Sequence, residues 1–335
     1  MVKRTIKESA MWFFRKNAKD SQKTSVVPNS GDQNDQVPLG IQAHSQSGQY
    51  MLITADCAQD ESTFTVGYRK RGEGQYYLYE RHAQVCSGSL QRPNDGNVAN
   101  NGNFVLCDWL WGDNPKGVFC AFSKNGEKLI EHRFMANLGK TAISEDGCFG
   151  LCETFEADND DSNCLILFDL RNRTLIWKRM LPYARPNAYV IDPSVQCVRL
   201  IFSNVGHIEI SFDGEYINMR EWFKTVFSTG KDIIVVNSAE NVKTFLGEEQ
   251  MGGLNELIVS ALDRVIAGSF AGAERFTEGK YKAIASRLKG EFLCNCGQYQ
   301  QAITAFEIAL TYDPKIPVKR RIAAAKDKMN KFMNQ

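Results

Sequence analysis

The sequence predicts a mainly β domain of about four repeated units, followed by an α-helical domain. Two observations support this prediction. Small polar turns lead into apolar runs at intervals of 54, 45 and 48 residues between Gly48 and Val195. After residue 254 the apolar residues instead recur every three or four positions, which is the spacing of one helix face. We therefore divide the 335 residues into segments 1–36, 37–225 and 226–335.

Each β unit begins with a turn and closes with a hairpin. The four turns end at Gly48, Gly102, Gly147 and the matching Val195. Glycine suits such turns because it adopts positive φ at little cost. The second and third hairpins are predicted to turn at Ser123–Gly126 and Asp169–Arg173. Asn125-Gly126 and Asp213-Gly214 are strong hairpin signals between alternating apolar residues.

The first unit is looser, from Gly40 to Gln84. Its hairpin is predicted to turn at Arg69–Gly74 and to continue in a strand over Gln75–Tyr79. Arg92–Gly96, with Pro, Asn, Asp and Gly in succession, predicts a turn that carries the chain into the second unit.

Four short strands in about 40–50 residues is the period of a β-propeller blade. From Pro38 to Trp222 the units resemble WD40-like or quinoprotein-like blades, with a Ser/Asp-x-x-Gly turn before the strand and Phe168-Asp169 entering a hairpin that ends on Trp177. The Trp-Asp pair of strict WD40 blades is missing. The resemblance implies a propeller-like domain of about four blades, as a small closed ring or an open array completed by another chain. A single β-sandwich or meander is the alternative.

The segment after Trp222 is predicted to become helical. The β-branched run Ile233–Val236 predicts one more strand first. Apolar periodicity then predicts four helices, over residues 254–270, 281–294, 299–310 and 317–333.

The second and third of these helices carry a specific pattern. Between about Ala283 and Ile316 it consists of Gly290, Leu293, Gly297, Tyr299, Ala302, Phe306, Ala309 and Pro314. This pattern resembles a tetratricopeptide (TPR) repeat, although Ser286 stands where an aromatic residue is usual. Its small residues allow close helix packing, and one repeat needs flanking helices because it cannot bury its own faces.

The N-terminal segment has a separate character. Residues 3–19 predict a helix in which Trp12-Phe13-Phe14 lie among basic residues. Such a helix could dock on a membrane surface or a partner, but we favour packing on the protein's own body. Asp20–Asp35 is polar throughout and predicts a linker.

Composition indicates an ordinary globular protein without a strong global charge. The net charge is +1, distributed as +3, −5 and +3 over the three segments. An apolar stretch of about 18 residues is missing, so we expect no membrane-spanning helix. The first residues do not form a secretory signal. Most of the ten cysteines lie in predicted strands, so we expect buried thiols, no disulfides and a cytoplasmic protein.

Catalytic or metal-binding motifs are not found in the sequence. It lacks a phosphate-binding Gly-rich loop ending in Lys-Ser or Lys-Thr, Gly-x-Ser-x-Gly and His-Glu-x-x-His. Glu156–Asn163 is acidic like a calcium loop but lacks the required Gly and Glu, so a solvated turn is favoured. Cys294 and Cys296 are too close for a zinc or redox pair. The four histidines, His44, His82, His132 and His207, are spread over the β units rather than clustered in the sequence. We expect no cofactor and no metal.

Both resemblances imply protein or peptide binding, so we expect a non-enzymatic scaffold that can also self-associate. The residues expected to bind a partner are Trp109, Trp111, Tyr281, Asn295, Lys319 and Arg320. One alternative is an enzyme or a small-ligand or metal sensor with its site at the propeller axis, built from histidines and acidic residues. A further alternative is nucleic-acid association through the basic C-terminal helix, although a solvated capping helix would have the same composition.

Overall fold

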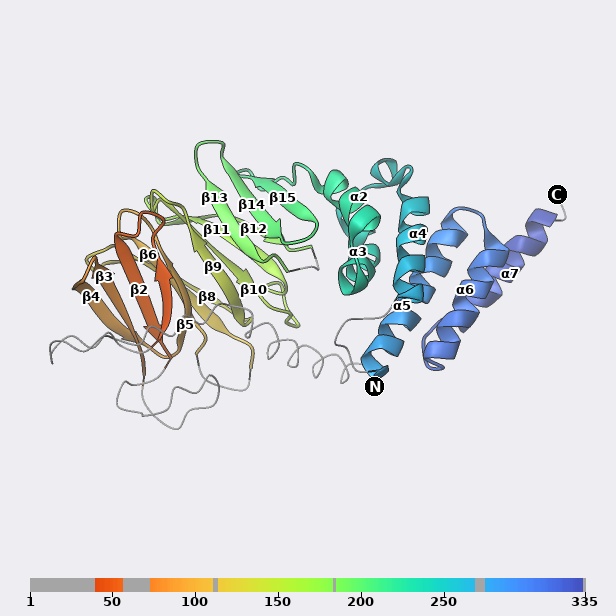
Figure 1. Ribbon diagram of the computed structural model, residues 1–335, viewed down its shortest axis with the longest axis horizontal. Helices are drawn as coiled ribbons and strands as arrows, with labels where there is room; N and C mark the ends of the chain where they lie inside the picture. Colours follow the sequence, from red (N-terminus) through yellow and green to blue (C-terminus); the bar gives the residue numbers. More distant parts are fainter. Residues whose placement is uncertain (1–39, 57–72, 111–113, 183–184, 269–274, 334–335) are drawn as a thin grey trace. The chain divides into compact units, whose positions relative to one another are not determined.

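The computed structural model describes residues 40–56, 73–110, 114–182, 185–268 and 275–333. Within these residues, four antiparallel sheets are followed by six α-helices and one short 3-10 helix (Figure 1). These described residues all belong to one compact unit. The helix predicted over residues 3–19, the linker Asp20–Asp35 and most of the turn predicted at Arg69–Gly74 lie outside the described residues.

Each sheet is a meander whose strands neighbour one another in chain order. The first contains β1 (Ile41–His44), β2 (Tyr50–Ala55), β3 (Gly74–Glu80) and β4 (Ala83–Leu90). The second contains β5 (Pro93–Val98), β6 (Phe104–Asp108), β7 (Gly117–Phe122) and β8 (Lys128–Phe134). The third contains β9 (Leu138–Ile143), β10 (Phe149–Thr154), β11 (Cys164–Asp169) and β12 (Thr174–Met180). The fourth contains β13 (Ala188–Asp192), β14 (Cys197–Phe202) and β15 (Gly206–Ser211).

The turns that define the repeat are confirmed in the first three sheets. Gly48, Gly102 and Gly147 have φ of 71°, 84° and 68°, a left-handed conformation that glycine adopts without a Cβ clash. In the fourth sheet the left-handed residue is Gln196, at φ 50°, one residue beyond the predicted Val195. The hairpin turns predicted at Ser123–Gly126, Asp169–Arg173 and Asp213-Gly214 are present as well.

The four sheets pack face to face in chain order, with their first strands gathered on one side. β5 contacts β1 and β2, β9 contacts β5 and β6, and β13 contacts β9. Between the first two sheets, Tyr76 packs against Phe104 and Phe122 at centroid distances of 5.6 and 5.3 Å. Between the second and third, Phe119 stacks on Phe168 at 4.6 Å. This arrangement of blade-like sheets fits a propeller-like domain.

The turn predicted at Arg92–Gly96 is wrong, because Pro93–Val98 form the first strand of the second sheet. Proline is tolerated at the first position of a strand, and a bulge follows it before Asp95. Packing requires a glycine at position 96, because an added Cβ would lie 2.7 Å from the Leu106 side chain and 2.9 Å from the Leu52 side chain. Local turn preference is therefore outweighed by contacts with two sheets.

The fourth sheet lacks a fourth strand within the described residues, and the chain after β15 replaces it. Only Tyr216 makes a bridge, to Ile210. The side chain of Asn218 accepts a hydrogen bond from Glu209 N–H at 2.8 Å and donates one to His207 C=O at 3.1 Å. One carboxamide thus supplies the donor and the acceptor that a neighbouring strand would present to β15. Asn218 also immediately precedes the first described helix.

The helices follow directly. They are α2 (Met219–Thr229), α3 (Asp232–Phe245), the 3-10 helix Glu248–Met251, α4 (Leu254–Ala267), α5 (Arg275–Asn295), α6 (Tyr299–Tyr312) and α7 (Lys319–Met333). The four helices predicted after residue 254 are confirmed, whereas α2 and α3 were not predicted.

The strand predicted at Ile233–Val236 is wrong, because these residues lie in α3. Buried residues of α3 recur at helical spacing, namely Val235, Val236, Ser238, Ala239 and Val242. β-Branched residues lose little by adopting a helix when the helix buries them, so the contacts of α3 with α2, α4 and α5 decide its conformation.

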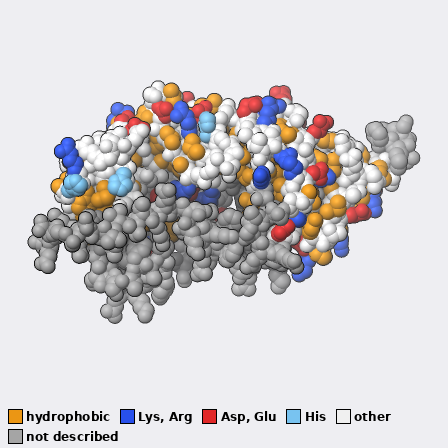
Figure 2. Space-filling view, in the orientation of Figure 1, with side chains coloured by type: hydrophobic (Ala, Val, Ile, Leu, Met, Phe, Trp, Pro, Cys, Tyr) orange, Lys and Arg blue, Asp and Glu red, His pale blue; other side chains and the backbone are white. Residues whose placement is uncertain are grey.

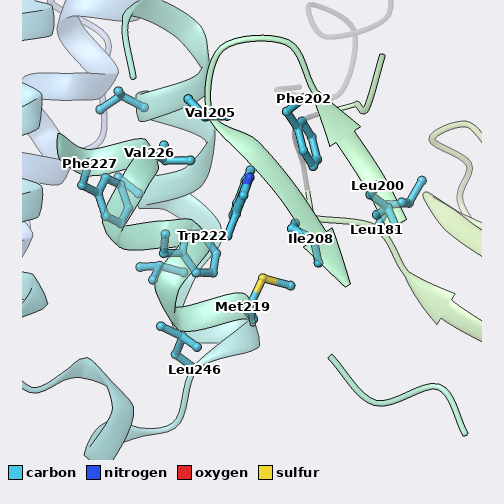
Figure 3. Close-up of a cluster of buried hydrophobic side chains, with 14 of the residues drawn as sticks. Leu181, Leu200, Phe202, Val205, Ile208, Met219, Trp222, Val226, Phe227 and Leu246 are labelled. Atoms are coloured by element: carbon cyan, nitrogen blue, oxygen red, sulfur yellow. The ribbon is translucent and has the colours of Figure 1, made fainter. Parts of the chain in front are cut away.

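The fourth sheet and the helices share one hydrophobic core. Trp222 of α2 lies 4.9 Å from Phe202 of β14, centroid to centroid, beside Ile208 (Figure 3). Strand register places Leu200 and Ile208 on the face that also packs against the third sheet. The opposite face carries Arg199, which pairs with Asp192 at 3.4 Å and Glu209 at 3.2 Å. Among the described residues, no core cluster joins this polar face to the first sheet.

The described sheets therefore form an open array rather than a closed ring. The polar face of the fourth sheet ends the array, as the outer face of a terminal repeat does. On its other face, α2 covers the apolar residues of the fourth sheet that the third sheet does not cover.

Candidate interaction surfaces and a buried polar cluster

Of the six residues predicted to bind a partner, the five that the structure describes do not converge on one site. Trp109 lies just after β6, and Trp111 lies outside the described residues. Tyr281 is half-buried on α5 against the core that the helices share with the fourth sheet. Asn295 is exposed at the end of α5, and Lys319 and Arg320 are exposed at the start of α7.

Trp109 is mainly a packing residue. It is partly buried against the core between the second and third sheets, and the Arg92 guanidinium lies 5.8 Å from its ring centroid. Its buried indole N–H has no hydrogen-bond acceptor within the part of the chain that the structure describes. These contacts show a packing role for Trp109, and its part in binding a partner stays a prediction.

The helical array joins neighbouring helices through close packing and ion pairs. An added Cβ on Gly290 of α5 would lie 2.5 Å from the ring of Phe306 on α6, so this glycine allows the two helices to approach. Arg287 of α5 pairs with Glu240 of α3 at 2.6 Å. Glu291 of α5 pairs with Arg321 of α7 at 3.2 Å. α5 therefore has α6 and α7 on one side of the array and α3 and α4 on the other.

Charge on the helices is mixed rather than of one sign. On the face shown in Figure 2, acidic and basic side chains are interspersed over the helical part with hydrophobic side chains between them. The basic residues of α7 include exposed Lys319, Arg320, Lys326, Lys328 and Lys331.

A small groove lies between α4 and the turn that joins α5 to α6. Its volume is about 220 Å³. α4 lines it with Glu256, Val259, Ser260 and Asp263, and the opposite wall consists of Leu293, Cys296 and Gln298. The sequence could not predict this groove, because its two walls lie far apart in the chain.

A largely buried polar cluster lies where the second, third and fourth sheets adjoin, on β5, β9, β10 and β13, and no sequence motif marks it. Thr141 of β9 donates from N–H and hydroxyl to Asp95 of β5, each at 2.7 Å. Glu153 of β10 is 2% exposed and accepts from Lys140 N–H at 3.1 Å and from the Tyr189 hydroxyl of β13. Three successive sheets are thereby tied together.

This cluster has unusual proton affinities. Burial raises the pKa of Asp95 to about 6, and Glu153 adds to the effect while the Thr141 hydrogen bonds oppose it. Burial and the Glu153 carboxylate raise the pKa of Tyr189 well above its usual value. The cluster's carboxylates already accept hydrogen bonds from protein donors, so it braces the sheets rather than presenting free ligands.

The acidic loop and the buried cysteines, which were also considered for chemistry, have structural roles. Asp161 of the acidic loop Glu156–Asn163 accepts a bond from Met135 N–H at 2.7 Å and pairs with Lys178 at 2.6 Å. Burial raises the pKa of the Cys107 and Cys152 thiols, so both are inert at neutral pH. Burial lowers the pKa of His132.

Within the described ranges, no three His, Cys, Asp or Glu side chains gather as a metal site would require. No described helix is long and apolar enough to cross a membrane.

Comparison with known proteins gives a weak structural likeness. No protein-family model matches the chain, and no curated protein sequence does. Among solved structures, it is similar to the β-propeller domain of Cps50 (Swd1) from Myceliophteria thermophila, with a TM-score of 0.31 and 11% identity. The match spans about half of each chain, 51% of this one and 51% of the other. The order and packing of the four sheets are therefore what support the propeller-like description.

Proposed function

We propose that this chain is a non-enzymatic protein-interaction scaffold. It combines a propeller-like domain, over residues 37–225, with a TPR-like helical domain, over residues 226–335. The observation that carries the proposal is the α5–α6 hairpin, in which Gly290 lies against Phe306 while α4 and α7 flank the pair. Stacked antiparallel helices of this kind offer an extended surface to a protein or peptide.

The flanking helices meet a requirement of the TPR-like interpretation. Ala302, Phe306 and Ala309 of α6 are at most 1% exposed and belong to one core with Ile316 and Val318. A single repeat could not bury these side chains without a neighbour, and α7 supplies it. The cytoplasmic location expected from the sequence is part of this proposal.

A ligand or metal sensor at the first strands is the alternative function. Asp95 of β5 and Glu153 of the adjoining β10 are two carboxylates of this region, but Thr141, Lys140 and Tyr189 already bond to them. The scaffold function therefore has the stronger support. Nucleic-acid binding would use the exposed lysines of α7, and a steep salt dependence would reveal it.

Affinity capture of the tagged full-length chain tests the proposal. A double variant, Lys319→Glu with Arg320→Glu, reverses two exposed charges on α7. The matched control, Lys124→Glu with Arg133→Glu, reverses two exposed charges on the second sheet. We expect a stoichiometric partner that the α7 variant loses and the control retains. If both variants retained the partner, α7 would not be part of the binding surface. If nucleic acid or metal co-purified without a protein, the scaffold function would be contradicted.

A further inference from the structure

The outer edge of the first sheet is unpaired within the part of the chain that the structure describes. β4 is the last strand of that sheet and is hydrogen-bonded to β3 alone (Figure 1). A bulge leaves Val85 without a partner on β3, and the five residues after it, Cys86–Leu90, pair with β3 in regular register. The regular backbone of such an edge is a template on which a further strand can be added.

The outer edges of the other three sheets are protected. β8 and β12 contain the same bulge, and the position that matches Ser87 is occupied by Glu131 in β8 and by Lys178 in β12. Charged side chains on an edge strand discourage the addition of another strand. Asn218 already occupies the edge of β15. β4, in contrast, has eight residues and carries no charge on any of them.

The sequence of this edge is self-complementary. Cys86-Ser87-Gly88-Ser89-Leu90 is nearly palindromic about its central glycine. When two copies pair antiparallel about a two-fold axis at Gly88, each residue before the glycine lies opposite one after it in the other copy. Ser87 is then opposite Ser89, and Cys86 is opposite Leu90. The same surface on both copies supplies both halves of the contact.

The two faces of β4 suit this pairing. Ser87 and Ser89 are exposed, so their hydroxyls can bond to each other across the two strands and to water. Cys86 and Leu90 are half-buried on the other face, against the core between the first two sheets. A second copy places its Leu90 beside Cys86 and its Cys86 beside Leu90, which removes further apolar surface from water.

We infer that β4 pairs with β4 of a second copy of this chain, antiparallel about Gly88, so that the two first sheets become one continuous sheet. Each copy supplies donors and acceptors to the outward-facing N–H and C=O groups of the other strand. The inference goes beyond the proposed scaffold function, because the surface proposed for a partner lies on the helices and β4 belongs to the first sheet.

Sedimentation equilibrium of the full-length chain tests the inference, since it measures the dissociation constant of a dimer. Ser87→Lys with Ser89→Lys places lysine opposite lysine at two places in the paired strands. Ser87→Lys with Ser89→Glu places lysine opposite glutamate at the same two places. Glu131→Lys, at the matching position of β8, is the control. All three positions are exposed, so folding is retained, which circular dichroism checks.

We expect the parent to dimerise and the double-lysine variant to dimerise about tenfold more weakly, with a larger difference at low salt. The lysine–glutamate variant and Glu131→Lys should dimerise like the parent. A monomeric parent, or an unchanged double-lysine variant, would overturn the inference.

Two further results would also contradict it. Loss of the dimer in the lysine–glutamate variant would exclude pairing about Gly88, and loss in Glu131→Lys would place the interface on β8 instead. The scaffold function is tested separately, because capture of a partner through α7 does not depend on any of these substitutions.

Discussion

At the scale of single residues, Asn218 substitutes for a missing strand. Its amide pairs with the backbone of β15 at 2.8 and 3.1 Å, and Ile217 N–H donates to Glu209 C=O at 2.9 Å. An unpaired sheet edge would invite another strand to pair with it. The residue thus protects the outer edge of the fourth sheet where the chain leaves it for α2.

Replacing Asn218 with alanine should destabilise the protein by about 2 kcal/mol, since each of two hydrogen bonds contributes about 1 kcal/mol. Urea denaturation at neutral pH measures the change. Asn218→Asp keeps the acceptor for Glu209 N–H and loses the donor to His207. Its free energy of unfolding should therefore lie between those of the parent and of Asn218→Ala. Equal stability of Asn218→Ala and the parent would show that water replaces both bonds.

Because the pKa of Asp95 is raised, we expect the free energy of unfolding to depend on pH. Its folded-state pKa is about 6, above the ordinary 3.8, so the folded protein binds a proton more tightly than the unfolded chain. The stability that protonation contributes is complete below about pH 4 and is lost as the pH rises through 6. We expect the unfolding free energy to fall by up to about 3 kcal/mol over this range through this group.

Asp95→Asn removes the titrating group and retains an oxygen for the Thr141 donors. The difference in unfolding free energy between parent and variant should therefore change between pH 4 and 7, with the parent relatively more stable at low pH. A difference that stays constant across this range would show that Asp95 titrates normally.

At the scale of elements, the close packing of α5 against α6 depends on which position of α5 is a glycine. A Cβ added at Gly290 would lie 2.5 Å from the Phe306 ring, whereas one added at Gly279 of the same helix would have nothing within 4 Å. The same substitution at the two positions therefore separates packing from helix propensity.

Gly290→Ala should destabilise the protein by about 1–3 kcal/mol through overpacking. Gly279→Ala should stabilise it by about 0.5–1 kcal/mol, because alanine has the better helix propensity. Thermal and urea denaturation of the two variants give the comparison. If Gly290→Ala were also stabilising, the close approach of α5 and α6 would not depend on this glycine.

The elements also show which parts of the fold could be predicted from the sequence. Hairpins with Asn-Gly or Asp-Gly turns were predicted, because such turns are specified locally by residues that adopt positive φ. Helices with a clear apolar period were predicted for the same reason. Ile233–Val236 and Arg92–Gly96 were assigned wrongly, because α3 and β5 take their conformation from neighbours far away in the chain.

At the scale of the whole molecule, the fourth sheet and the helices are parts of one core. The cluster around Trp222 extends from Leu151 and Leu167 of the third sheet to Leu262 of α4 and Phe292 of α5. A chain that ended at Thr229 would leave this apolar surface of α2 and the fourth sheet exposed to water. We therefore expect these sheets and helices to unfold together.

Trp222→Ala should destabilise the protein by about 3–5 kcal/mol. Hydrogen exchange should increase together in β14 and α4, and less in β2 and β3, whose core is a separate cluster. Phe104→Ala, in that separate cluster, is the matched control with the opposite pattern. Increased exchange in the helices alone would mean that the helical part unfolds independently of the sheets.

By itself, the sequence determined the repeat of β units, the positive-φ turns at Gly48, Gly102 and Gly147, and the helices after residue 254. Each of these features is encoded within a few neighbouring residues. Only the tertiary structure decided that the described sheets form an open array, that Asn218 replaces a strand, and that Asp95 and Glu153 meet between three sheets. It alone also brought Glu256 opposite the end of α5. These features depend on contacts between residues distant in the chain, which no local pattern specifies.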